Sequence, residues 1–210
     1  MFLGFSPLLR RVWASVPTQC LFCQAWPVEA AVCAACVQQH LRPAVRCALC
    51  ACRLPPELGD SMSAAAVCGA CAHTPPPLWA CTAALDYEPP WAGLIGRWKF
   101  HEQAALASFL AARLLAHSSV RDLLSQVDAI IPIPPSSARL RQRGYYHTLM
   151  LARALCTQVE CPRPIWPQAL LRLPGKDELS QAKRKRSERL AQMKNAFLPA
   201  PATAPLLRGA

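Results

Sequence analysis

The chain has 210 residues, and 53% of them are hydrophobic, which is enough to bury a core and excludes a wholly disordered protein. Lys and Arg number 23 against 12 Asp and Glu. The resulting net charge of +11 favours anionic partners such as phosphates, nucleic acid or a membrane surface, without choosing among them. The 21 prolines argue against an all-helical bundle and favour turns and extended connections.

The first residues, 1–19, form a short apolar and basic leader. Its apolar residues come before its basic ones, which is the reverse of a secretory signal peptide. Elsewhere no stretch approaches the ~20 uncharged apolar residues of a membrane span. We therefore expect a cytoplasmic protein with no membrane span.

Eight of the twelve cysteines form four Cys-x-x-Cys pairs within residues 20–72. This repeated spacing is typical of metal ligands and differs from a scattered disulfide framework. Two intervening residues let both thiolates of a tight turn reach one metal ion, and two such turns complete a tetrahedral four-sulfur site that suits Zn²⁺. Four sulfur ligands leave no open position, which predicts two structural sites without a catalytic role. The predicted ligands are Cys20, Cys23, Cys33, Cys36, Cys47, Cys50, Cys68 and Cys71.

The spacing leaves the pairing of the four turns open. Sequential pairing, first with second and third with fourth, is favoured because shorter loops cost less entropy to close, and interleaved pairing is the alternative. Cys52 is a spare thiol that could replace Cys50 as a ligand. An iron–sulfur cluster is an alternative cofactor, but the closely spaced four-cysteine runs of such clusters do not occur here.

Consecutive prolines within residues 73–77 predict a stiff hinge, followed by a second domain over residues 78–210. In that domain apolar runs alternate with segments of helical periodicity, which indicates an α/β fold. Residues 127–133 have the β-branched, apolar composition of a buried parallel strand. The expected strands are residues 81–87, 127–133 and 165–171, and the expected helices are residues 91–100, 102–117, 119–126, 146–159 and 177–193.

A basic loop is expected after the strand at residues 127–133. Ligands of α/β folds bind at loops that follow the carboxyl ends of parallel strands, and arginine guanidinium groups match phosphate oxygens. Arg139, Arg143 and Gly144 are therefore the predicted contacts to a phosphate or pyrophosphate group. The alternative is a solvated basic turn with no ligand.

A second basic segment lies between residues 172 and 194, where eight basic residues stand against three acidic ones. Its densest run predicts a surface that follows nucleic-acid phosphates. The alternative is a solvated helix face, since charge runs are usually solvated. The predicted nucleic-acid contacts are Lys183, Arg184, Lys185 and Arg186.

Four pieces of the sequence together resemble one family. They are CLFC…CAAC…CALC…CGAC, PPPLWACTAALDYEPPWAGLIGRWKF, DAIIPIPPSSARLRQRG and KNAF, and they follow one another over nearly the whole chain. This combination resembles the ComF family (ComF/GntX-type competence proteins). The resemblance implies a double zinc ribbon at residues 20–72 and a type I phosphoribosyltransferase-like domain, with a parallel sheet between helices, at residues 78–210. It also implies a cytoplasmic role in handling incoming single-stranded DNA during natural transformation, with proteins of the DNA-uptake machinery as partners.

Two departures from the family pattern bear on activity. The family's Arg-Gly-Phe-Asn-Gln reads Arg-Gly-Tyr-Tyr-His at residues 143–147. The family's motif for phosphoribosyl diphosphate (PRPP), an apolar strand with two adjacent acidic residues and a Thr-Thr-Gly loop, does not occur in residues 1–210. We therefore expect a C-terminally incomplete sheet without the PRPP loop, no identifiable catalytic residue, and self-association through an unpaired sheet edge.

Two other functions stay open at the level of sequence. The first is an active phosphoribosyltransferase of nucleotide salvage, which would use Mg²⁺ and would need the PRPP motif to be supplied. The second is a zinc-ribbon nucleic-acid-binding protein whose α/β part only supports the ribbon. In each case the expected partner is single-stranded DNA or another phosphate-rich ligand.

Overall fold

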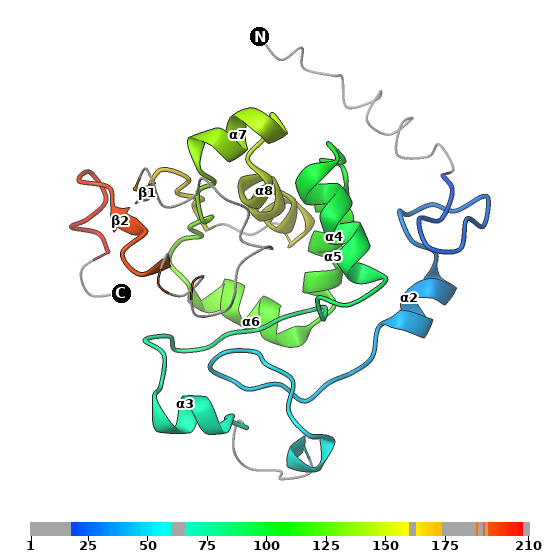
Figure 1. Ribbon diagram of the computed structural model, residues 1–210, viewed down its shortest axis with the longest axis horizontal. Coiled ribbons are helices and arrows are strands. Elements are labelled where there is room, and N and C mark those ends of the chain that lie inside the picture. The colour runs from blue at the N-terminus through cyan, green and yellow to red at the C-terminus, as the bar shows by residue number, and fades with distance from the viewer. Residues whose placement is uncertain are drawn as a thin grey trace. The chain divides into compact units, whose positions relative to one another are not determined.

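A computed structural model describes residues 18–59, 66–159, 163–173, 188, 191 and 193–207 (Figure 1). Contacts between backbone positions divide the chain into two units, Met1–Leu94 and Ile95–Ala210. The first unit holds the four cysteine pairs, and the second holds the longer helices. The predicted leader and most of the predicted helix at residues 177–193 lie outside the described residues.

In its described part, the first unit contains short helical segments joined by turns. They are α2 (Ala34–His40), the 3₁₀ turn η1 (Pro56–Gly59), α3 (Gly69–His73) and the first residues of α4 (Trp91–Phe100). One buried cluster consists of Leu54 with two cysteines, Cys47 and Cys71. Large aliphatic side chains contribute little to this interior, so the unit needs a further source of stability.

A tryptophan anchors the second half of the first unit. Trp91 is 3% exposed, and its Nε1 donates a hydrogen bond to the carbonyl oxygen of His40 at 2.9 Å. Its ring meets the ring of Phe22 edge to face, with 5.0 Å between the centroids. Edge-to-face pairs of this kind add to the gain from burial. The start of α4 is thereby fixed to the segments that surround the first cysteine pairs.

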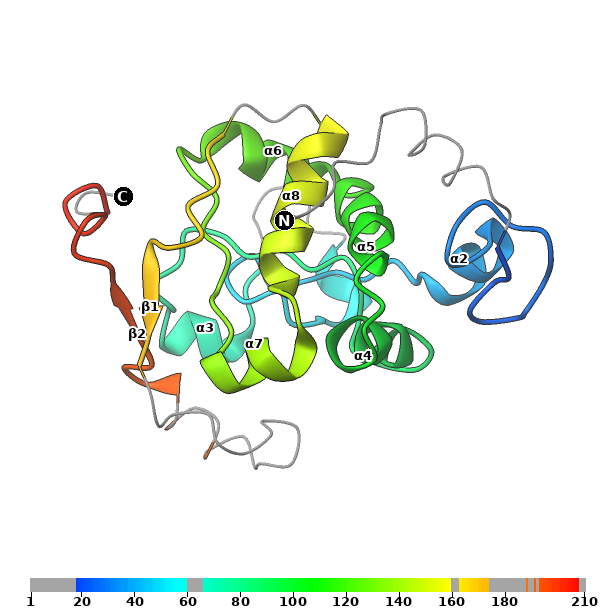
Figure 2. The same cartoon turned by 90° about the horizontal axis from the view of Figure 1, so that it is seen from above.

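The second unit is mainly helical. After the rest of α4 come α5 (Leu106–Leu115), α6 (Ser118–Gln126), α7 (Ser137–Arg143) and α8 (His147–Val159). The helices α5 and α8 pack along each other (Figure 2). The buried side chains of α5 recur at helical spacing, and they are Leu106, Ala107, Leu110, Ala111 and Leu115. Ala152 is the buried residue of α8. This apolar interface is the core of the unit.

Four predicted helices correspond to observed ones: residues 91–100 to α4, 102–117 to α5, 119–126 to α6 and 146–159 to α8. Among the described residues, none of these helices combines the length and the apolar character needed to cross a bilayer.

The basic segment at residues 139–144 differs from its prediction as a loop, because it is the helix α7. The side chain of Ser136 caps this helix by accepting a hydrogen bond from the backbone N–H of Arg139 at 3.2 Å. Gly144 ends it in the left-handed conformation, with φ of 75°. Serine before a helix and glycine after it are the favoured capping residues. The two caps therefore turn a short arginine-rich stretch into a helix.

Sheet structure in the described residues is limited to one antiparallel pair and isolated bridges. Strand β1 (Leu170–Arg172) pairs with β2 (Phe197–Pro199), and Leu171 lies opposite Leu198. A single parallel bridge joins Ile130 to Ile165. The fold is therefore mixed, with helices, a small two-stranded sheet and two cysteine clusters. The predicted phosphoribosyltransferase-like parallel sheet is not observed among the described residues, and of the strand predicted at residues 127–133 only this bridge is present.

The predicted strand at residues 81–87 is absent for a physical reason. The backbone N–H of Cys81 donates to the carbonyl oxygen of Ala48 at 2.8 Å, within the first unit. The carboxylate of Asp86 accepts hydrogen bonds from Arg46, at 2.9 Å, and from Arg53. These bonds tie the segment to the turns that carry the cysteines. An apolar run is drawn into a sheet only when a neighbouring strand offers its backbone groups, and this run bonds elsewhere.

Candidate metal centres

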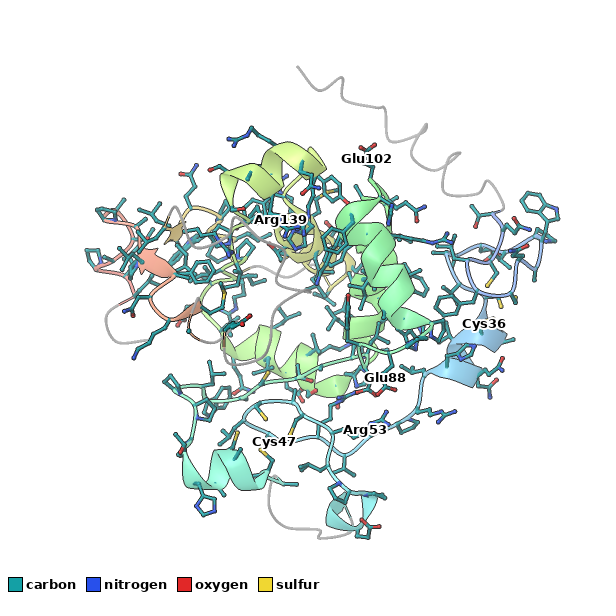
Figure 3. All side chains as sticks on the ribbon, in the orientation of Figure 1. Cys36, Cys47, Arg53, Glu88, Glu102 and Arg139 are labelled. Atoms are coloured by element: carbon teal, nitrogen blue, oxygen red, sulfur yellow. The ribbon has the colours of Figure 1, made fainter. Side chains whose placement is uncertain are left out.

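Two groups of four thiols lie in the first unit. The first group consists of Cys20, Cys23, Cys33 and Cys36, and the second consists of Cys47, Cys50, Cys52 and Cys68; within each group the sulfur atoms all lie within 4.8 Å of one another. Figure 3 labels one member of each group, Cys36 on α2 and Cys47. The first group joins the first and second Cys-x-x-Cys pairs. The second group draws on the third and fourth pairs. The favoured sequential pairing is the arrangement found.

The local structure of the first centre follows from its backbone hydrogen bonds. A tight turn closes after Cys20, whose carbonyl oxygen accepts from the N–H of Gln24 at 2.9 Å, and Gln24 adopts a φ of 62°. Helix α2 begins after Cys33, whose sulfur accepts from the N–H of Cys36 at 3.5 Å. The sulfur of Cys20 in turn accepts from the N–H of Cys33 at 3.3 Å. A hydrogen bond to a cysteine sulfur thus joins the turn after Cys20 to the start of α2.

The second centre repeats this construction. Cys47 closes the same turn, with the N–H of Ala51 donating to its carbonyl oxygen at 2.8 Å and Ala51 at a φ of 57°. Helix α3 begins after Cys68, whose sulfur accepts from the N–H of Cys71 at 3.4 Å. The sulfur of Cys47 accepts from the N–H of Cys68 at 3.4 Å. The unit therefore contains one structural motif twice, with turns and helices in the same order.

The distances between sulfur atoms fit a tetrahedral ion. With metal–sulfur bonds of about 2.3 Å, the sulfurs of a tetrahedral zinc site lie about 3.8 Å apart. The Sγ atoms of Cys23 and Cys33 are 3.7 Å apart, and those of Cys50 and Cys68 are 3.8 Å apart. Each of these pairs links a turn to the helix that completes its centre. Both groups therefore have the donor set and the spacing to hold a metal ion.

The predicted ligands differ from the observed groups at one position. Seven of the eight belong to the two groups, and Cys71 does not belong to the closest four of the second centre, where Cys52 stands instead. Cys50 and Cys52 lie in this group together, so the replacement of Cys50 by Cys52 as a ligand stays a prediction.

The environment of the first cysteine in each motif favours its thiolate. Hydrogen bonds from backbone N–H groups, the largest from Cys68, lower the pKa of Cys47 to about 6. Burial acts against ionisation at Cys20, but N–H groups led by that of Cys33 prevail and lower its pKa to about 6 as well. Burial raises the pKa of Cys36 to about 12. Each centre thus offers an incoming cation a ready thiolate at neutral pH.

Two ion pairs join the residues on either side of the turn that begins at Cys47, called the second turn below. Asp86 accepts hydrogen bonds from Arg46 and Arg53, which face each other in an antiparallel bridge. Burial would raise the pKa of Asp86, but the hydrogen bond from Arg46 and the charges of both arginines hold it below its usual value. With Glu88, these side chains line a polar cavity of about 260 Å³. The carboxylate therefore stays charged and bound to the turn.

The predicted phosphate contacts Arg139 and Arg143 lie together beside the ring of Phe100. The guanidinium groups of Arg143 and Arg139 lie over the ring of Phe100, at 5.0 Å and 5.9 Å from its centroid. Burial, and then the charge of Arg143, lower the pKa of Lys99. Lys99, Arg139 and Arg143 are called the cation cluster below; Figure 3 labels Arg139 within it and Glu102 just after α4. The sequence signal for Lys99 was its place in the last turn of a predicted helix.

The other predicted contacts, Gly144 and the basic run at residues 183–186, are not part of the cation cluster. Gly144 lies next to it in sequence, but its observed role is to end α7, where its N–H donates to the carbonyl oxygen of Leu140 at 2.9 Å. Contact of Gly144 with a phosphate stays a prediction. The run Lys183, Arg184, Lys185 and Arg186 lies outside the described residues, so its contact with nucleic acid also stays a prediction.

His147 gives the second unit an acid-sensitive group. Its Nδ1 lies 3.0 Å from Nη1 of Arg143, and its ring packs edge-on against Trp98. Burial, followed by the charges of Arg143 and Lys99, lowers its pKa to about 4. Between its usual pKa near 6.5 and pH 4, the unfolded chain therefore binds a proton that the native chain does not.

The stability of the second unit should consequently fall as the pH drops from about 6.5 toward 4. Above pH 6.5 both states have a neutral imidazole, and His147 has no effect on the pH dependence. Thermal melting of wild type and His147→Gln over this range tests the expectation, with the variant showing a flatter profile. His117→Gln, also in the second unit, controls for loss of a histidine, and equal profiles for wild type and His147→Gln would contradict it.

Comparison of the chain with protein-family models, with curated proteins and with solved structures found no match. The resemblance to the ComF family therefore rests on the sequence motifs alone. The candidate sites rest on the geometry of the thiol groups and of the cation cluster.

Proposed function

We propose that the chain is a ComF-type, phosphoribosyltransferase-like accessory protein that handles incoming single-stranded DNA, with two structural zinc ions in its first unit. Zinc fits both centres because each offers four sulfurs within 4.8 Å of one another, and one sulfur–sulfur distance in each, 3.7 Å and 3.8 Å, matches a tetrahedral site. Zinc bound in this way would hold turn and helix together and would have no open position for a substrate. The cation cluster of the second unit is then the contact for DNA phosphates.

The observation that carries the proposal is that the positive charges of the cation cluster lie close together around the half-exposed ring of Phe100. Phe100 is 45% exposed, and the two arginines stack on it. The charge of Arg143 also lowers the pKa values of Lys99 and His147, so the cations repel one another. A phosphate group would relieve this repulsion and form charge-assisted hydrogen bonds with the guanidinium groups. The planar guanidinium groups and the exposed part of the ring add surfaces on which a base can stack.

A salt titration of DNA binding tests the proposal. We expect labelled oligothymidylate to bind with an affinity that falls as salt rises, since bound phosphates release counterions. Each lost contact to a single strand removes ~0.7 from the slope of log affinity against log salt, so Arg139→Ala/Arg143→Ala should reduce the slope by about 1.4. Fluorescence anisotropy at several salt concentrations measures both affinity and slope.

Two further variants separate a specific contact from net charge. Arg121→Ala/Arg153→Ala removes two exposed arginines from α6 and α8 and leaves the cation cluster intact. It should retain most of the slope. Alanine at the four positions Lys183, Arg184, Lys185 and Arg186 tests the other predicted contacts. If the two double variants lose the same slope, the cation cluster is not a DNA site.

A further inference from the structure

The second centre contains five thiols, although a tetrahedral ion uses four. Cys47, Cys50, Cys52 and Cys68 have their sulfurs within 4.8 Å of one another. Cys71 lies in the same buried cluster as Cys47, and burial together with the neighbouring thiols of Cys50, Cys68 and Cys47 raises its pKa above the usual value. Its backbone N–H also donates to the sulfur of Cys68. Two cysteines, Cys52 and Cys71, therefore compete for the place of one ligand.

Cys52 and Cys71 can each be compared with the residue at the equivalent position of the first centre. In the first motif the N–H of Cys20 donates to the carbonyl oxygen of Ala25 at 3.0 Å, and in the second the N–H of Cys47 donates to that of Cys52 at 2.9 Å. Cys52 thus occupies the position of an alanine in an otherwise equivalent turn. Cys71, in contrast, has the position of Cys36 in the helix that follows the second pair.

The two competitors also differ in burial. Cys71 is 7% exposed, close to the 5% of its counterpart Cys36, whereas Cys52 is exposed. Cys71 is therefore buried at the same place in its helix as a ligand of the first centre. Cys52 lies close to the other sulfurs but is exposed to solvent. The first centre has no equivalent choice, because Ala25 carries no donor atom.

We infer that Cys47, Cys50 and Cys68 hold the second metal ion permanently, while Cys52 and Cys71 alternate as its fourth ligand. The inference rests on the metal centres of the proposed function. In an exchange, the incoming thiol loses its proton and its thiolate bonds to the metal, while the departing thiolate takes up a proton. No electrons are transferred, and the ion keeps four sulfur ligands before and after. One thiol of the centre is always free of the metal.

Serine substitutions test the alternation. In the zinc-loaded full chain we expect Cys52→Ser and Cys71→Ser each to retain two ions, because the other thiol completes the site. Cys52→Ser/Cys71→Ser should retain one ion. Cys36→Ser is the matched control, since the first centre has no spare thiol, and it should lose one ion. Metal content after dialysis against a fixed concentration of chelator is the readout.

Alkylation of the unmodified protein gives a test that needs no variant to fold. Iodoacetamide applied to the zinc-loaded wild type should modify Cys52, the exposed member of the pair, as located by mass spectrometry. The second ion should remain bound, because Cys71 then serves as the ligand. Release of an ion in step with modification of Cys52 would show that Cys52 is a fixed ligand and would overturn the alternation.

The outcomes separate this inference from the proposed function. If Cys71→Ser loses an ion and Cys52→Ser does not, the centre has four fixed ligands and alternation is wrong, while both metal sites stand. The reverse result makes Cys52 the fixed ligand and overturns alternation equally. If wild type binds fewer than two ions, the proposed metal centres themselves fail. The ion of the first centre, retained in every variant except Cys36→Ser, reports that the unit is folded.

Discussion

Removal of metal should unfold the first unit while the helices of the second unit stay folded. The buried interior of the first unit, in its described part, includes four cysteines and only a few large side chains, such as Val32, Leu54 and Trp91. Without a bound ion, the thiolates favoured at Cys20 and Cys47 have no cation beside them, and only weak hydrogen bonds to sulfur join each turn to its helix. Metal binding in small zinc domains supplies about 10–16 kcal/mol, which exceeds the stability of many domains. The core between α5 and α8 contains no metal ligand and is independent of this contribution.

Hydrogen exchange followed by mass spectrometry measures the effect region by region. After chelation, amides within residues 18–59 and 66–94 should lose protection, and those of α5 and α8 should keep it. Cys47→Ser should reproduce the loss of protection around the second centre without a chelator. Cys156→Ala, a cysteine of α8 outside both centres, is the matched control and should retain two ions. Unchanged exchange in the first unit after complete metal removal would contradict a structural role.

Truncation of Leu110 to alanine should lower the unfolding free energy of the second unit by about 2–5 kcal/mol. Leu110 is 6% exposed and is one of the regularly spaced buried side chains of α5, the helix that packs along α8. Removing its side chain loses the transfer free energy of the buried methyl groups and leaves a cavity beside α5. No other described core in this unit has as many buried side chains to compensate.

Urea unfolding of the zinc-loaded chain, monitored by circular dichroism, measures this loss. Leu140→Ala makes the same chemical change on α7, where the side chain is 41% exposed. Substitutions at such surface positions usually change stability by no more than about 0.5 kcal/mol. Equal destabilisation by the two variants would show that the interface between α5 and α8 is not the core of the unit.

The ligand set was largely predictable from the sequence because its chemistry is local. Two residues between cysteines fix the geometry of a turn, whatever the rest of the chain does. The place of Cys52 was not predictable in the same way. It depends on Ala51, which adopts a left-handed backbone with φ of 57° and so directs the next residue back to the cluster. Non-glycine residues rarely adopt this conformation, and no pattern in the sequence announces it.

The repeat of the two motifs was also hidden. The equivalent cysteines Cys20 and Cys33 are 13 residues apart, whereas Cys47 and Cys68 are 21 residues apart, so the motifs do not align at a fixed period. Insertions in a connecting loop cost little free energy, and a motif tolerates them while its hydrogen bonds persist. The similarity of the two motifs is therefore visible in the hydrogen bonds from backbone N–H groups to the sulfurs and not in the spacing of the cysteines.

Helices were more predictable than strands, for a reason that particular segments illustrate. The helix at residues 91–100 satisfies its hydrogen bonds within its own sequence, and its predicted bounds are those of α4. A strand needs a partner elsewhere in the chain, and residues 81–87 bond instead to the cysteine turns. The capping residues of α7 were present in the sequence as Ser136 and Gly144, and they outweigh the basic character that favoured a loop.

The carboxylate of Asp86 makes the second turn preorganised. Arg46 immediately precedes Cys47 and Arg53 immediately follows Cys52, and one side chain from residue 86 bonds to both. Two guanidinium groups held side by side would otherwise repel each other and open the turn at its base. The turn of the first centre is closed by the pairing of Thr18 with Val28, and no ion pair is found at its base among the described residues. The second turn can therefore keep its shape while its thiols change partners.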